Sequence, residues 1–268
     1  MAIPEHTQEF QPTPDPSVGQ RRTLYWTRGK QVFYRSYPVR GADIETFSYY
    51  LGNFAKDSKH CYCTNSRLAG GQGATFRTLN YTYATDGISV WTLGGKIKDA
   101  DAESFVVCDD GVLYHDINTP VPYGFGKDKQ RVYHYNYRGK PNWVRKASSA
   151  SFVSLNDGYF GKDDSFVFCG AVTLPKAKVE HWRKIGGYYS KDDARVFYFN
   201  RQIRDADQES FEFVPTKRNY VQLAKDKHRF YSNDDVIDEA SFFNKLQEYG
   251  VDTQDGQSTS HIKGLRDA

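Results

Sequence analysis

The chain has 268 residues and is almost balanced in charge, with 36 Lys and Arg against 33 Asp and Glu and a formal net charge of +3. Nucleic-acid-binding domains usually gather basic residues on one face. No basic run occurs here, so we expect no nucleic-acid partner. No stretch approaches the roughly 18 apolar residues that a membrane helix needs, which argues against membrane insertion. The first residues lack the apolar segment of a secretory signal, and the expected compartment is the cytoplasm.

Aromatic residues are the main source of buried area in this sequence. They make up 16% of the chain, with 20 Tyr and 18 Phe against one Met. Tyr and Phe favour strands and bury large areas. The composition therefore predicts a mainly β protein with an aromatic core.

The expected organisation runs from one loose end to the other. Residues 1–22 hold four prolines among polar neighbours and are predicted to form a flexible tail. N-terminal repeats follow over residues 23–105, an irregular insert over 106–125 and C-terminal repeats over 126–248. Residues 249–268 are polar, contain Gly and Ser, and are predicted to form a second flexible tail.

A repeat of about 30 residues becomes visible when one aspartate is taken as its origin. These origin aspartates are Asp57, Asp86, Asp128, Asp163, Asp192 and Asp226, with Arg28 in the equivalent place of the first copy. The residue two positions before the origin is small in six copies. Asp side chains accept hydrogen bonds from backbone N–H groups two residues on, so each origin predicts a tight turn.

Five residues after the origin, the side chain is aromatic in every copy. These ladder aromatics are Phe33, Tyr62, Trp91, Tyr133, Phe168, Phe197 and Tyr231. They lie in predicted short strands that end at hairpin turns near Gly95, Gly139 and Asn200. We predict that they point inward and stack from repeat to repeat. A row of exposed aromatic platforms for sugars is the alternative.

A second landmark, A-D-x-x-[ST]-F in its best copies, ends each repeat. Its closing aromatics are Phe47, Phe76, Phe105, Phe152, Trp182, Phe211 and Phe242. Asp43, Asp101 and Asp207 are predicted N-caps of one helical turn, which the closing aromatic anchors in the core. The predicted fold class is thus mainly β, with tandem repeats of about 30 residues, each a β-hairpin plus a helical turn, arranged in two halves.

The spacing from a closing aromatic to the next origin aspartate is irregular between Phe105 and Asp128. These two residues are 23 positions apart, whereas the tight copies have a spacing of 10. This insert at 106–125 is the predicted boundary between the halves. Function often lies where a scaffold departs from its own pattern, and aromatic side chains beside acidic ones suit a basic protein partner. The predicted partner-binding residues are Asp109, Asp110, Tyr114, Asp116 and Tyr123. A solvated connecting loop is the alternative interpretation.

Three stretches resemble the DKNYY repeat family of bacteria: GKDKQRVYHY at 126–135, SKDDARVFYF at 190–199 with RDADQESFEFV at 204–214, and AKDKHRFYS at 224–232. The resemblance covers roughly residues 25–246 and departs at Arg28 and at Cys61-Tyr62-Cys63. It implies a non-enzymatic repeat scaffold, and some members occur among the protective partners of secreted toxins. It carries over no catalytic or binding residue.

No pattern in the sequence indicates catalysis, a cofactor or a metal. Cys61, Cys63, Cys108 and Cys169 match neither zinc-site nor disulfide spacings, and we expect them to be reduced and structural. GGQG at 70–73 lacks the Lys-Ser/Thr pair of a phosphate loop. Asp99, Asp101 and Glu103 resemble the start of a calcium loop but lack its later Gly and Glu. The histidines are expected to be surface or packing residues.

Three functional hypotheses follow. The preferred one is a cytoplasmic immunity protein that neutralises a secreted bacterial toxin by steric occlusion, because repeat arrays present broad surfaces to protein partners. The alternative is a cell-wall or carbohydrate-binding module with one weak site per repeat. An enzyme is the least favoured hypothesis, since it needs a pocket of perturbed titratable groups that the sequence does not indicate.

Overall fold

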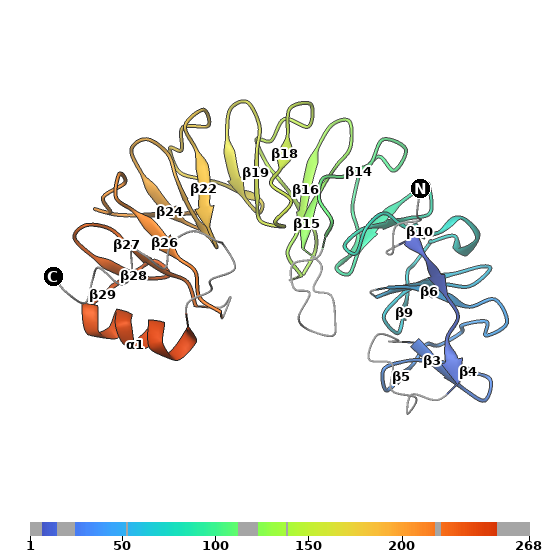
Figure 1. Cartoon of the computed structure of the whole chain (residues 1–268). Helices are drawn as coiled ribbons and strands as arrows, with labels where there is room; N and C mark the ends of the chain where they lie inside the picture. The colour runs from blue at the N-terminus through green and yellow to red at the C-terminus, as the bar shows by residue number, and fades with distance from the viewer. Residues whose placement is uncertain are drawn as a thin grey trace. The chain divides into compact units, whose positions relative to one another are not determined.

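A computed structural model describes residues 7–14, 25–51, 53–111, 123–137, 139–217 and 221–250. The chain divides into two compact units, Met1–Val172 and Thr173–Ala268. Each unit is a succession of small sheets in chain order (Figure 1). Seven sheets lie within the described residues, so the predicted mainly β architecture of about seven tandem repeats is confirmed.

The first unit holds five sheets. The first sheet has β2 (Thr13–Pro14), β3 (Tyr25–Arg28), β4 (Gln31–Tyr34) and β5 (Tyr37–Pro38), and the second has β1 (Glu9–Phe10), β6 (Ser48–Tyr50), β7 (Phe54–Lys56), β8 (Cys61–Cys63) and β9 (Ser66–Arg67). The third has β10 (Arg77–Thr78), β11 (Ala84–Thr85), β12 (Val90–Thr92) and β13 (Gly95–Lys96). The fourth has β14 (Val106–Val107), β15 (Gly124–Lys127), β16 (Val132–Tyr135) and β17 (Asn142–Trp143), and the fifth has β18 (Val153–Ser154), β19 (Phe160–Lys162), β20 (Val167–Cys169) and β21 (Val172–Thr173), at which the unit ends.

The second unit holds two sheets and a helix. Its first sheet has β22 (Arg183–Gly186), β23 (Tyr189–Lys191), β24 (Val196–Tyr198) and β25 (Arg201–Ile203). Its second has β26 (Glu212–Val214), β27 (Leu223–Lys225), β28 (Phe230–Ser232) and β29 (Asp235–Ile237), followed by α1 (Glu239–Tyr249). No described helix is long and apolar enough to cross a membrane.

Each origin aspartate makes the turn between two consecutive strands of its sheet, the second of which carries the ladder aromatic. All six are buried, and Oδ1 of each accepts the backbone N–H groups two and three residues on, at 2.7–2.9 Å. The predicted turn is therefore confirmed. Two N–H groups that would lack a partner on folding are thus satisfied inside the core.

The second oxygen of the same carboxylate bonds to the preceding repeat. Oδ2 accepts, at 2.8–3.2 Å, one backbone N–H from the turn that ends that repeat. The donors are Asp43, Gln72, Asp101, Ser148, Lys178 and Asp207. Burial by itself would raise the pKa of Asp57, Asp128 and Asp226, but these N–H donors and a tyrosine hydroxyl together hold it below its ordinary value.

Five of the closing aromatics also join consecutive repeats, because each of these rings lies between a ring of its own repeat and the ladder aromatic of the next. Phe105 lies 5.3 Å from Tyr83 in its own repeat and 5.9 Å from the ladder aromatic Tyr133 in the next. The same arrangement surrounds Phe47, Phe76, Phe152 and Phe211. Every ladder aromatic is at most 7% exposed, so the predicted inward-facing series is confirmed and the row of exposed platforms is wrong.

The close ring contact explains the small residue two positions before the origin. A Cβ on Gly126 would lie 2.5 Å from Cζ of Phe105, and one on Gly161 would lie 2.4 Å from Cζ of Phe152. Such approaches are far inside normal contact distance, so only a very small residue leaves room for the closing ring. The sequence constraint is therefore a packing constraint between strand and ring.

The first and last repeats close their own open faces. In the first repeat, Phe33 is covered by Trp26, at 4.5 Å, and by the Arg28 guanidinium, at 5.2 Å. Arg28, which stands in the place of the origin aspartate, thus packs on the ladder aromatic of its own repeat. In the last repeat, Phe242 and Leu246 of α1 pack over Leu223. Terminal capping of this kind is typical of repeat arrays.

Parts of the structure differ from the expectation. Residues 9–14, placed in the first tail, include β1, which pairs with β6, and β2, which pairs with β3. The division between compact units lies at Val172 and Thr173, while the insert at 106–125, expected to separate the halves, is inside the first unit. Most closing segments are hydrogen-bonded turns without helix, but in the last copy Asp238 caps the eleven-residue α1.

We predict that Asp163→Asn lowers the free energy of unfolding by about 1–3 kcal/mol, because an amide NH₂ then faces a buried N–H donor. Asp163 accepts from Ser165, Phe166 and Ser148. Its neighbour Asp164 is exposed in the same turn, and Asp164→Asn should change the value by no more than about 0.5 kcal/mol. Urea unfolding of the two variants measures the difference, and equal effects would contradict the assigned role.

We also predict that Phe105→Ala costs about 3–5 kcal/mol, since it removes a ring packed between two repeats. The adjacent Val106 is 50% exposed, and Val106→Ala provides the matched control. Urea titrations followed by tyrosine fluorescence report both values. A cost for Phe105→Ala as small as that of its neighbour would show that the closing ring does not join the repeats.

Candidate functional site

The insert leaves and rejoins the fourth sheet of the first unit at one place. Its ends follow β14 and precede β15, which pair with each other. The Tyr123 N–H donates to the carbonyl of Gly111 at 3.3 Å. We call residues 108–111 and 123–124 the neck. In the sequence, the predicted binding residues Tyr114 and Asp116 come between the two segments of the neck, outside the described residues.

Asn80 and Thr82 of the preceding repeat hold the neck. The Asn80 amide donates to the carbonyl of Asp109 at 2.9 Å. Oγ1 of Thr82 lies 2.7 Å from the carbonyl of Gly111 and 3.1 Å from that of Tyr123. Both side chains are buried. Sequence reasoning missed these residues, because other copies also have polar residues at the same positions, such as Asp157 and Asn53, and nothing local distinguishes Asn80 and Thr82.

Asp109, predicted to contact a partner, is a buried residue of the neck. Its Oδ2 accepts from Phe125 N–H at 2.7 Å and from the Ser154 hydroxyl at 3.3 Å. Its Oδ1 lies against Gly124, where a Cβ would be 2.1 Å away. Burial raises the pKa of the carboxyl to about 7. Asp109 therefore shapes the neck and offers no surface to a partner.

Asp110 and Tyr123 lie at the outer side of the neck. Asp110 is exposed and exchanges two hydrogen bonds of 2.9 Å with the side chain of Asn156. The ring of Tyr123 packs against Tyr159 at 5.1 Å. Together these four residues form a patch on which an acidic group and two aromatic rings adjoin the insert. The structure thus brings two of the predicted residues together at the surface.

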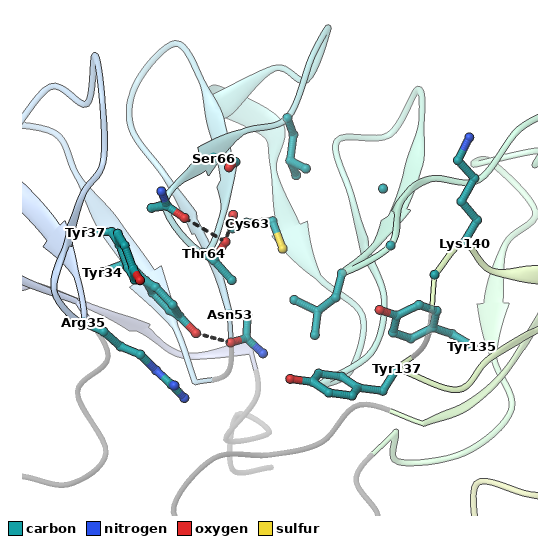
Figure 2. Close-up of a pocket in the computed structure, with 16 residues that line it drawn as sticks. Tyr34, Arg35, Tyr37, Asn53, Cys63, Thr64, Ser66, Tyr135, Tyr137 and Lys140 are labelled. Carbon is teal, nitrogen blue, oxygen red and sulfur yellow. Dashed lines mark hydrogen bonds between the residues drawn. The ribbon is translucent and has the colours of Figure 1, made fainter.

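A second feature of the first unit is a cleft of about 830 Å³ (Figure 2). Its walls are the β4–β5 turn of the first sheet and the β16–β17 turn of the fourth, and its floor is made by the β8–β9 and β12–β13 turns of the second and third sheets. Tyr34 and Tyr37 face Tyr135 and Tyr137 across it, with Cys63 between them. Sequence reasoning missed this cleft, because hairpin turns of different repeats form it only after folding.

Several of the side chains considered for chemistry are part of the packed interior. Burial raises the pKa of Cys61, Cys63 and Cys108 to about 12, so their thiols remain protonated and unreactive. Burial lowers the pKa of His134 to about 4, while its ring packs on Phe125. Gly73 of GGQG lies against the Asp57 turn. Among the described residues no cluster of three metal-binding side chains occurs.

The neck should make stability depend on pH in a particular direction. Because the pKa of Asp109 is raised on folding, its contribution is fully present below the unfolded pKa and is lost as pH rises through about 7. We predict that Asp109→Asn is more stable than the native chain at pH 8, by a few kcal/mol at most, and gains nothing at pH 4. Paired urea titrations at both values test this, and a difference independent of pH would contradict it.

Comparison with known protein families identifies the same repetitive part of the chain. Searches of curated proteins and of solved structures returned no match. A match to the DKNYY family covers residues 54–201, more than half of the 268 residues and thus most of the repeats built on origin aspartates. The chain belongs to the DKNYY family.

Proposed function

We propose that this chain is a non-enzymatic protein-binding repeat protein that acts in the cytoplasm as an immunity protein. Its partner would be a secreted bacterial toxin, which it neutralises by covering the toxin's active site. No chemistry by this chain is required, and neither a cofactor nor a nucleic acid takes part. The observation that carries the proposal is the neck, which holds an insert on an otherwise regular scaffold.

The neck has the construction expected of a binding loop. Loops that carry function are often held by rigid elements, and here Asn80, Thr82 and Asp109 fix both ends of the insert from inside the core. Asn80 and Thr82 are buried and bind backbone carbonyls at the two ends of the insert. A connection with no role would not need a dedicated set of buried partners, so the neck supports a function for what it holds.

The patch beside the neck suits a protein surface better than a small molecule. Asp110, Tyr123, Asn156 and Tyr159 combine one carboxylate with two aromatic rings, and tyrosines are enriched where proteins bind one another. The carbohydrate-binding alternative relied on one exposed aromatic per repeat. The burial of all seven ladder aromatics removes that support.

Shortening the insert tests the proposal. Because Gly111 O and Tyr123 N are already 3.3 Å apart, residues 112–122 can be replaced by two glycines without moving the neck. We expect the shortened chain to keep its melting temperature within a few degrees and to lose capture of its stoichiometric partner from lysate of the native host. Asp110→Ser should weaken the same complex at least about tenfold, as loss of a central interface contact does.

Asp164→Asn serves as the control, because Asp164 is exposed in a regular turn of the fifth repeat, and it should leave capture unchanged. Recovery of no stoichiometric partner by the native chain would overturn the proposal. Capture that survives both the shortening and Asp110→Ser would place the binding surface elsewhere. The size of the complex by light scattering gives an independent measure of stoichiometry.

A further inference from the structure

One sheet edge of the first unit is occupied by another segment of the chain. β6, β10, β14, β18, β22 and β26 each follow a closing aromatic and form the first strand of a repeat. β6 is paired on its outer side by β1, which is a fifth strand of the second sheet. Phe10 of β1 lies opposite Tyr49, and the two rings stack at 5.7 Å. The second sheet therefore shows that this edge accepts an extended segment.

A carboxylate fastens β1 to the strands beside it. Oε1 of Glu9 lies 2.7 Å from Nζ of Lys56, on the second strand of the repeat, and accepts the Tyr50 hydroxyl at 3.2 Å. Oε2 accepts the Ser48 hydroxyl at 2.9 Å. Burial by itself would raise the pKa of Glu9, but these three partners hold it below its ordinary value. The occupied edge thus binds an acidic residue that is followed by an aromatic one.

The other first strands differ in the residue with which they begin. β10, β22 and β26 begin with the exposed charged residues Arg77, Arg183 and Glu212. Charged side chains on an edge strand discourage pairing with another chain. β14 and β18 begin instead with Val106 and Val153, which are 50% and 60% exposed. An exposed apolar edge strand is a template for strand addition, so these two edges are the candidates for a partner.

β18 differs from β14 in the lysine on the neighbouring strand. Lys162 lies opposite Val153 in the ladder and has the place of Lys56, which lies opposite Ser48. In the fourth sheet the equivalent Lys127 donates to two backbone carbonyls of the next closing turn, at 3.0 and 3.1 Å. Lys162 is half-buried, and within the part of the chain that the structure describes its ammonium has neither a hydrogen bond nor an ion pair. It is therefore available for a carboxylate, as Lys56 is for Glu9.

The backbone of β18 presents Ser154 to the open edge. The Leu155 N–H donates to the carbonyl of Phe160 at 2.9 Å, across the ladder with β19. Because inward and outward groups alternate along an antiparallel strand, the N–H and C=O of Ser154 point away from β19. Ser154 has the place of Tyr49 in β6, the residue with which Phe10 pairs. The backbone groups that hold β1 on β6 thus have counterparts on β18.

We infer that β18 accepts an extended segment of the protein partner, with a carboxylate at Lys162 and an aromatic or apolar side chain opposite Ser154. The edge is continuous with the patch beside the neck, because the Ser154 hydroxyl donates to Asp109 at 3.3 Å and accepts the N–H of Asn156 at 3.2 Å. The inference rests on the proposed function, since the segment would belong to that partner. Backbone pairing would supply affinity, and the two side chains would supply specificity.

Fluorescence anisotropy with the full chain tests the inference. The probe is fluorescein-labelled Thr-Val-Glu-Phe-Val-Thr, which has a carboxylate and a ring in the order of Glu9 and Phe10. A peptide with N-methylphenylalanine lacks the N–H that pairs with Ser154 and should bind at least about tenfold more weakly. Ser154→Pro removes the donor of the edge from this chain and should also cost at least about tenfold in affinity. Ser154→Ala is the matched control, because it removes only the hydroxyl, and it should cost less than about threefold.

Lys162→Gln isolates the charge contact. It should weaken binding of the probe about threefold and leave unchanged the binding of a peptide that has Gln in place of Glu. Melting temperatures of the three variants establish that they fold. No binding of the probe at millimolar concentration, or equal binding by Ser154→Pro or of the N-methyl peptide, would overturn the inference. A captured partner that Ser154→Pro binds normally would overturn the assignment of β18 alone, whereas a native chain that captures no partner would overturn the proposed function.

Discussion

The buried carboxylate of the origin aspartate is the contact on which the repetitive structure depends. One oxygen closes a turn inside its own repeat, and the other binds a backbone N–H of the repeat before it. A residue with a single acceptor cannot do both, and Glu is too long to reach its own turn. Local folding and repeat-to-repeat association therefore rest on the same side chain. The first copy has Arg28 in place of this aspartate, and its guanidinium lies over Phe33.

Other parts of each repeat are not needed for the packing of one repeat on the next. The origin turn and the closing aromatic ring carry the contacts between neighbours. The turn between the third and fourth strands, and the connection from closing aromatic to origin, can then vary in length and composition at little cost, as surface loops generally do. The cleft results from variation at the first place, and the neck and its insert from variation at the second.

The repeat could be predicted because its signals are local and are dictated by packing. Asp128, Tyr133 and Phe105 keep their residue types wherever the same contacts recur, so counting from one aspartate located strands, turns and core side chains. The cleft was not predicted, because its lining residues, which run from Tyr34 to Lys140 in the sequence, share one cleft only through the stacking of four repeats. Asn80 and Thr82 were missed for the same reason, since their partners are 29 residues away in the chain. The helix α1 exceeded the expected single turn because it covers an open end.

Asp109 and Asp128 show how the site differs from the scaffold that holds it. Both are buried carboxyls of the same sheet, yet the environment raises the pKa of Asp109 and lowers that of Asp128. Asp128 receives four hydrogen bonds to its two oxygens, whereas the described bonds to Asp109 reach one oxygen. An aspartate kept at a place that does not favour its charge lowers stability, and such groups are concentrated at functional sites. The neck is thus the part of the array where a buried aspartate differs from the origin aspartates in its hydrogen bonds and in the direction of its pKa shift. This difference agrees with a role in holding a binding insert.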